Sequence, residues 1–406
     1  MRASYGQVAL VDAGGFFPEN DDPEYRAVAS FLMDGKVLLG VDAVGAGEKE
    51  LRFGYSFLKA NIERSGLPVV CSNLFMKKTG KPALTPYIIK KIGTVKVGFF
   101  GLMNEKLTYG PSEDSLRVDE PTATARRVVA EMRKKGATVT VLLSQLGKVD
   151  SEDLVAVVPG IDVLIVGHAS SLLMKGRMIK NTVAAYGGEK GQHIGRTIVT
   201  LDAKRAQATA ESETFVLSAE VGERAEIARL VKAFDDGFNE KLRKVQKERA
   251  AEAAKTKSSD NPDRFLGADL CMRCHQSEGE QWKTTSHSVA WKTLTDGGND
   301  TKAECVGCHV VGYRKPGGFQ SVTDAPRLAN VQCENCHGMG TTHESFANPK
   351  KTVTEATCVE CHQGENDSHW NWQAKRALIV HSNHSRETLL KKTPGATTMP
   401  KAAGSH

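Results

Sequence analysis

The feature that most constrains this chain is the pattern Cys-x-x-Cys-His, which occurs four times in its last third. Two thiols separated by two residues can both reach one edge of a porphyrin. In c-type attachment the thiols form thioethers with the haem vinyl groups, and the adjacent histidine binds the iron as its proximal ligand. The cysteines of the four motifs are Cys271, Cys274, Cys305, Cys308, Cys333, Cys336, Cys358 and Cys361, and the histidines are His275, His309, His337 and His362.

Two other uses of paired cysteines fit these motifs less well. Two Cys-x-x-Cys pairs can hold a structural zinc ion, and single pairs occur in redox-active sites. Neither use explains why a histidine follows the second cysteine in every copy. The sequence therefore predicts four covalently bound haems c, each with one iron.

Charge and apolar runs limit the environments in which the chain can act. The 54 basic residues nearly balance the 48 acidic ones. Because the sequence contains no long block of charges of one sign, nucleic acid is not expected as a partner. No apolar run reaches the ~18 residues of a transmembrane helix. Because haem attachment takes place outside the cytoplasm, we expect a periplasmic or extracellular protein. No apolar signal segment follows Met1, so we expect the gene to start upstream, or Met1 to be internal or engineered.

Residues 1–218 are predicted to form an α/β domain. Short apolar, β-rich runs alternate with helical patterns there, including core strands at 138–143 and 161–166 and a helix at 121–134. Cys71 is the one cysteine outside the haem motifs. It lies in an apolar run and is expected to be a buried free thiol.

Six segments of this domain resemble, in the same order, the signatures of the calcineurin-like metallophosphoesterases, in particular their 5'-nucleotidase branch. The resemblance implies an α/β sandwich fold. In that family two metal ions held by Asp, Asn and His side chains support phosphoester hydrolysis. The matching segments are 10–17, 43–51, 70–73, 142–147, 161–168 and 186–195.

The departures from that family fall on its metal ligands, and the strand with its first Asp-x-His is missing. Only His168 is retained, and two metals cannot be held by one ligand. We therefore expect a scaffold without divalent metal or phosphoesterase activity, so that the chain is expected not to be an enzyme. Where the family has a bridging Asp, an Asn-His pair, a ligand His and a final x-His, this chain has Gly15, Glu48 with Lys49, Gln145, and Ala169 with Ser170.

Residues 219–266 are predicted to form a long amphipathic helix followed by a polar linker. Apolar residues recur every three or four positions between Ile227 and Val245 and form one stripe, while charged residues occupy the other faces. The helix is expected to close the α/β domain. The alternative is a helix that packs against a second copy or another partner.

Residues 267–406 are predicted to be a small, mostly helical or irregular domain whose core is made by the haems. The chain between successive motifs is too short to bury a core of its own. Each iron needs a sixth ligand or keeps an open position, and bis-histidine ligation gives low-spin electron-transfer haems. The histidines available for these positions are His287, His343, His369, His381, His384 and His406.

Residues 271–384 resemble the tetrahaem cytochromes c that accept electrons from hydroxylamine oxidoreductase. The resemblance rests on the segment that ends at His287, on the second motif with its following glycines, and on the third motif with its following His343. By position it implies His343 as distal ligand of the first haem, His287 of the third and His381 of the fourth. It leaves the second haem, bound through His309, without a partner.

Several alternatives exist for the sixth ligand of the iron in the second haem. Its iron can stay five-coordinate and bind a small ligand such as nitric oxide or hydroxylamine. His384, His369 or a residue of a neighbouring subunit can instead provide the sixth ligand. The alternative for His369 is that it packs against neighbouring side chains and binds no iron.

The expected function is electron transport by a multihaem cytochrome c. Four closely packed haems would carry electrons in periplasmic or extracellular respiration, with redox proteins as partners. One alternative is a subunit of a polymeric extracellular cytochrome filament, which is a homo-oligomer. Another is an enzyme, either a haem reductase acting at an open second haem or a residual phosphoesterase.

Overall fold

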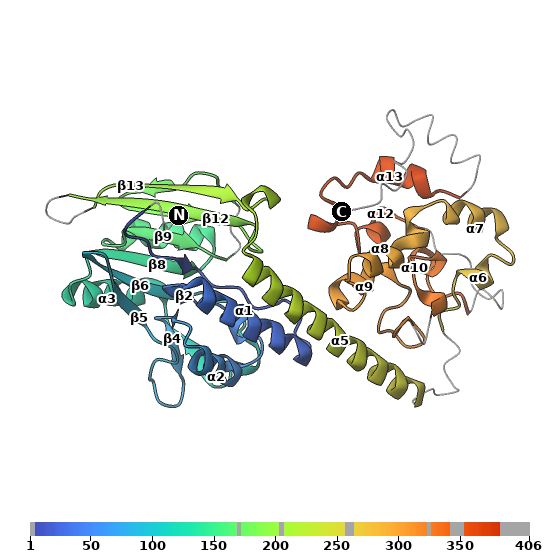
Figure 1. Ribbon diagram of the computed structural model, residues 1–406, viewed down its shortest axis with the longest axis horizontal. Helices are drawn as coiled ribbons and strands as arrows, with labels where there is room; N and C mark the ends of the chain where they lie inside the picture. Colours follow the sequence, from blue (N-terminus) through green and yellow to red (C-terminus); the bar gives the residue numbers. More distant parts are fainter. Residues whose placement is uncertain are drawn as a thin grey trace. The chain divides into compact units, whose positions relative to one another are not determined.

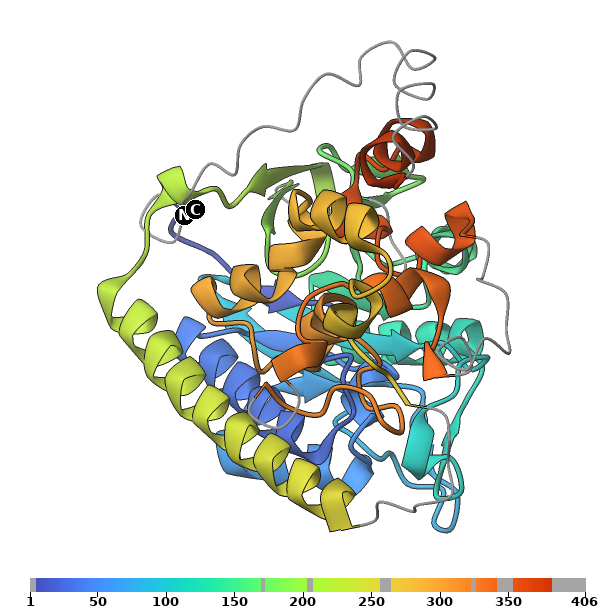
Figure 2. The same ribbon diagram turned by 90° about the vertical axis from the view of Figure 1, so that its right-hand side faces the viewer.

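The computed structural model describes residues 5–168, 172–202, 207–255, 264–322, 326–341 and 353–381. It divides into two compact units, Met1–Lys232 and Ala233–His406. Helix α5 (Ala225–Lys255) runs unbroken across this boundary, as the yellow-green ribbon shows (Figure 1; Figure 2). The two units are described separately.

The first unit is built around a six-stranded mixed sheet with the order β10-β11-β9-β8-β6-β5. Strands β6, β8, β9 and β11 run parallel, and β5 and β10 pair antiparallel at the two edges. Several of these strands lie side by side in Figure 1. Their bounds are β5 Tyr87–Ile92, β6 Val95–Met103, β8 Val139–Gln145, β9 Val163–Val166, β10 Arg177–Ile179 and β11 Thr182–Tyr186.

A parallel three-stranded sheet, β1-β2-β3, and two antiparallel pairs, β12-β13 and β4-β7, complete the strands of this unit. The 3₁₀ helices of this unit are η1 Pro23–Tyr25, η2 Lys49–Leu51, η3 Gly110–Ser112 and η4 Ala219–Val221. The strands are β1 Val11–Asp12, β2 Ala43–Gly45, β3 Val69–Val70, β4 Leu74–Met76, β7 Leu116–Val118, β12 His193–Leu201 and β13 Gln207–Val216, and the α-helices are α1 Arg26–Leu39, α2 Tyr55–Ser65, α3 Pro121–Lys134 and α4 Lys148–Val157.

Two apolar clusters fill the two faces of the six-stranded sheet. Because side chains alternate along a strand, Phe99 and Phe100 enter different clusters. Phe100 packs with residues of α3 and α4, while Phe99 packs with residues of β2 and β3. This layering confirms the predicted α/β sandwich. Cys71 is a fully buried free thiol, as expected, and burial raises its pKa to about 12.

Helix α3 begins where its sequence provides a cap. The carboxylate of Glu120 accepts hydrogen bonds from the backbone N–H groups of Thr122 (2.7 Å) and Ala123 (2.6 Å). Pro121 occupies the first turn, where no N–H is needed. The helix has the predicted bounds, 121–134.

The second unit is made of short helices joined by loops, as predicted, and no named strand forms in the part of it that is described. An apolar cluster around Val306, Val310 and Phe319 lies at its centre. The 3₁₀ helices are η5 Ser286–Val289, η6 Pro326–Leu328 and η7 Gly364–Asp367. The α-helices are α6 Ala268–Cys271, α7 Gln276–Lys283, α8 Ala290–Asp296, α9 Ala303–His309, α10 Cys333–His337, α12 Glu355–Cys358 and α13 Trp372–Ile379.

From Ala233 onward, α5 belongs to the second unit. The amide of Asn239 accepts a hydrogen bond from the Thr301 hydroxyl at 2.7 Å, and Arg243 pairs with Asp300 at 3.2 Å. This differs from the expectation that the helix closes the α/β domain. An apolar stripe requires burial but does not specify the surface that provides it. Within the described residues, no helix has the length and apolar character needed to cross a membrane.

Candidate haem-binding site

The Cys-x-x-Cys-His motifs lie in short helical turns. The second motif ends α9 and the third motif is α10 itself, while α6 and α12 end at the first cysteine of the other two. The N–H of His275 donates to the carbonyl of Cys271 at 3.0 Å, and His362 repeats this with Cys358 at 2.9 Å. Residues three apart on a helical turn share one face, so both thiols of a motif can approach one macrocycle edge.

The thiols of different motifs also meet in pairs. Cys271 is hydrogen-bonded to Cys333, and Cys308 to Cys361. Within each pair the hydrogen bond lowers one pKa, that of Cys333 or Cys308, to about 7 and raises that of the partner. The first motif therefore adjoins the third, and the second motif adjoins the fourth.

Two pairs of imidazole rings have the separation expected of ligands on opposite faces of one metal. The ring centres are 6.1 Å apart for His287 and His362, and 6.1 Å apart for His337 and His381. Two imidazoles that each bind one ion through a nitrogen at about 2 Å have ring centres about 6 Å apart. Burial, followed by the charges of neighbouring histidines, lowers the pKa of His287 and so favours the neutral ligand form.

These pairs differ from the assignment that the cytochrome resemblance implied. That resemblance placed His287 on the third haem and His381 on the fourth, whereas the structure places His287 against His362 and His381 against His337. The Nε2 of Gln281 in α7 donates to the carbonyl of Leu378 at 3.0 Å. This bond holds the end of α13, and with it His381, close to α7.

The second ring nitrogen of three candidate ligands has its own acceptor. The Nδ1 of His309 is 2.6 Å from the carbonyl oxygen of Ala290, that of His362 is 3.1 Å from a carboxylate oxygen of Asp367, and that of His381 is 3.0 Å from Oε1 of Gln281. A hydrogen bond at Nδ1 fixes the tautomer and leaves Nε2 for a metal. The residues present therefore fit the haem groups that the motifs imply.

The remaining distal candidates are less defined. His343, His384 and His406 lie outside the described residues. His369 is exposed, and its Nδ1 lies 3.1 Å from the hydroxyl of Ser368. The contact agrees with the alternative of ordinary packing for His369.

In the α/β unit, the positions that resemble lost metal ligands meet around a buried carboxylate that the sequence reasoning did not single out. Glu50 is fully buried and accepts N–H groups from Gly47 (2.8 Å), Gly15 (3.1 Å) and Phe16 (2.8 Å). Burial raises its pKa despite these donors. A buried carboxylate needs hydrogen-bond donors. Here the backbone N–H groups of two loops provide them, so these loops stabilise Glu50 in its buried position.

The side chains at the substituted positions bond to the protein itself. Gln145 donates to the carbonyl of Ala13 at 2.9 Å, and His168 lies 3.2 Å from a carboxylate oxygen of Glu48. Lys49 pairs with Glu19 at 3.1 Å. Among the residues with described positions, no three His, Cys, Asp or Glu side chains gather as a metal site needs. Ala169 and Ser170 lie outside those residues.

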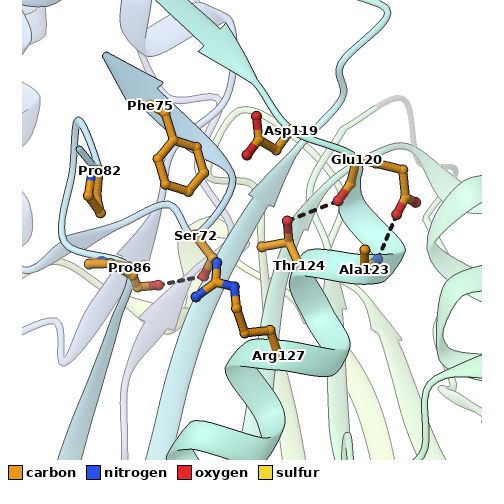
Figure 3. Close-up of a pocket in the computed structure, with 9 residues that line it drawn as sticks. All are labelled: Ser72, Phe75, Pro82, Pro86, Asp119, Glu120, Ala123, Thr124 and Arg127. Carbon is orange, nitrogen blue, oxygen red and sulfur yellow. Dashed lines mark hydrogen bonds between the residues drawn. The ribbon is translucent and has the colours of Figure 1, made fainter. Parts of the chain in front are cut away.

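A separate cavity of about 510 Å³ lies beside the start of α3 (Figure 3). Phe75, Pro82 and Pro86 form its apolar walls. Ser72 donates to the carbonyl of Pro86 within the cavity wall at 2.5 Å, and Arg127 binds Glu131 at 3.0 Å. Asp119 and Glu120 also line the cavity.

Comparison with known proteins separates the two units. Residues 270–338 match the family model for "Cytochrome c554 and c-prime". Cytochrome c-554 of Nitrosomonas europaea is 34% identical over 91 residues, which cover 19% of this chain and 39% of that protein. The second unit thus carries a cytochrome c554 domain.

The α/β unit is similar to a different class of proteins, the nucleotide phosphoesterases. A 2',3'-cyclic-nucleotide 2'-phosphodiesterase/3'-nucleotidase of Salmonella typhimurium is 30% identical over 227 residues, 46% of this chain and 35% of that protein. The match thus spans about a third of that relative's length. The crystal structure of a 5'-nucleotidase precursor from Thermus thermophilus aligns with a TM-score of 0.53 at 17% identity, covering 83% of this chain and 66% of that one.

A calcineurin-like phosphoesterase from Bacillus subtilis aligns with a TM-score of 0.51 at 20% identity, covering 58% of this chain and 85% of that one. These likenesses show that the first unit has the calcineurin-like phosphoesterase fold. The predicted fusion of such a domain with a cytochrome domain is confirmed.

Proposed function

We propose that the chain is a tetrahaem cytochrome c that carries electrons in periplasmic or extracellular respiration. The observation that carries the proposal is the presence of two pairs of facing imidazoles, His337 with His381 and His287 with His362, with ring centres 6.1 Å apart in each pair. In both pairs one ring belongs to a Cys-x-x-Cys-His motif and the other comes from a distant segment. When bound, the haems supply reversible one-electron chemistry.

The protein's own residues would hold each group in a defined way. His337 and His381 would hold the iron of the third haem, and His287 and His362 that of the fourth. His275 is the proximal ligand proposed for the first haem, with His343 as its distal candidate.

The sixth ligand of the second haem decides between an electron carrier and a protein that also binds a small ligand. Its proposed proximal ligand, His309, is fixed by Ala290 at 2.6 Å and adjoins the apolar cluster around Val306. His384 is the candidate that would close its other face. With His384 bound, the chain is a carrier alone, and with the position open it can bind a small ligand.

The meeting of thiols from different motifs supports close haem packing. Cys271 contacts Cys333, and Cys308 contacts Cys361. Thioethers at these sulfurs would bring the edges of the first and third groups together, and likewise those of the second and fourth. Short edge-to-edge paths are what a carrier requires, and a polymer of such subunits would extend the path.

The test is to produce the full chain with haem maturation machinery. The proposal expects a mass increased by four haems and an electron paramagnetic resonance spectrum dominated by low-spin ferric haem. A high-spin component of about one haem in four, if present, would assign an open second position. A colourless, haem-free exported protein would refute the proposal, and negative-stain images of native material would separate single molecules from filaments.

We further propose that the α/β unit acts as a scaffold without phosphoesterase activity. Glu50 fills the loops around Gly15 and Gly47 with a carboxylate held by backbone N–H groups. Metal analysis and a p-nitrophenyl phosphate assay with added Mn²⁺ test this. Stoichiometric metal together with turnover would reverse it.

A further inference from the structure

The three imidazoles with assigned Nδ1 acceptors differ in the charge of the acceptor. His309 faces the neutral carbonyl of Ala290, and His381 faces the neutral amide oxygen of Gln281. His362 alone among these three faces a carboxylate, that of Asp367, at 3.1 Å. The side chain of Asp367 is only 13% exposed, so solvent screens the interaction weakly.

Asp367 is held in place by several contacts. It ends η7, and the N–H of Trp370 donates to its carbonyl at 3.1 Å. Lys375 lies 3.7 Å from the same carboxylate oxygen that faces His362.

We propose that Asp367 is a positioning residue that lowers the reduction potential of the fourth haem, bound through His362. The inference rests on the proposed function. An imidazole that donates from Nδ1 to an anion gains electron density and is a stronger donor at Nε2. Stronger axial donation stabilises ferric over ferrous iron, and this lowers the potential.

The surroundings of His362 provide a matched control. The indole of Trp370 stacks on the His362 ring with centres 4.8 Å apart, and its Nε1 donates to Glu355 at 3.1 Å. Glu355 therefore places a second negative charge in the same region without bonding to the imidazole. Because Glu355 is exposed, solvent screens it more strongly.

The first experiment is a spectroelectrochemical titration of the full-length holoprotein and three variants. Asp367→Asn should raise the midpoint potential of one reduction step by about 59 mV. For a one-electron step, this makes the reduced-to-oxidised ratio of that haem at the wild-type midpoint about tenfold larger. Asp367→Glu should restore a lower midpoint, and Glu355→Gln should shift the same step by much less. An unchanged titration in Asp367→Asn, or an equal shift in Glu355→Gln, would overturn the proposal.

A second experiment leaves Asp367 in place. His287→Met replaces the proposed distal ligand of the fourth haem, and methionine ligation raises the potential. The step that moves should be the one that Asp367→Asn raises, and His381→Met should move a different step. Displacement by His287→Met of a step that Asp367→Asn leaves in place would overturn the proposal. Mass analysis separates this from failure of the proposed function, since that failure would leave fewer than four haems attached.

Discussion

The imidazole rings of His337 and His381 face each other with their centres 6.1 Å apart and their planes inclined by 34°. His337 ends α10, whereas His381 follows α13. Gln281 of α7 bonds to both His381 and Leu378 and so joins α7 to the end of the α13 segment. Three short helices thus converge on one proposed iron position, although none of them is long enough to be stable alone.

Replacing His381 with alanine is expected to convert one haem in four from low spin to high spin, because the proposed sixth ligand is lost. Electron paramagnetic resonance of the ferric protein measures this change directly. The matched control is His369→Ala, which removes an exposed histidine bonded to Ser368 and should leave the spectrum unchanged. A fully low-spin spectrum in the His381 variant would contradict the assignment.

Replacing Gln281 with leucine is expected to destabilise the second unit by about 1–3 kcal/mol, since buried partners lose their hydrogen bonds. Gln281 is 8% exposed, and both ends of its amide are engaged. Thermal unfolding followed by the Soret band measures the effect. Gln373→Leu, at an exposed position of α13, serves as the control and should change stability by less than about 0.5 kcal/mol. Equal losses of stability in the two variants would contradict the role assigned to Gln281.

The sequence predicts local chemistry better than long-range pairing. The helix at 121–134 is predictable because Pro121 and the Glu120 cap lie next to it in the chain. The fold of the first unit follows from the order of its apolar strands. The partner of His287 does not follow, because motif spacing contains no information on which distant turn faces it.

The role of Glu50 shows the same limit within the α/β unit. The substitutions at Gly15 and Gln145 are visible in the sequence and remove the metal ligands. That a neighbouring carboxylate collects three backbone N–H groups depends on the curvature of two loops that are far apart in the chain. A Glu next to a glycine-rich turn that resembles a metal loop is the only signal available beforehand.

Replacing Glu50 with glutamine is expected to change how stability depends on pH. Burial raises the pKa of Glu50 above its ordinary 4.5, so the folded state binds this proton more tightly than the unfolded state. The contribution of the group to stability is therefore full below about pH 4.5 and declines as the pH rises through the folded-state pKa. The free energy of unfolding of the wild type, minus that of the variant, should fall across this range.

Urea titrations at several pH values, read by hydrogen exchange of peptides from the α/β unit, measure this difference. Glu63→Gln is the control, because Glu63 is exposed and lies 3.9 Å from Lys59. A pH-independent difference for the Glu50 variant, or the same trend in the control, would contradict the assignment of a tightly held proton.

Preparing the full chain without haem maturation is expected to unfold the second unit and leave the first folded. The apolar cluster around Val306 and Phe319 involves only part of the second unit, and its helices are too short to persist without a core. The six-stranded sheet has apolar clusters on both faces and needs no haem. Hydrogen exchange should therefore show rapid exchange in α7 and α13 and protection in β6 and β8. Protection of α7 and α13 equal to that of the holoprotein would contradict a haem-dependent core.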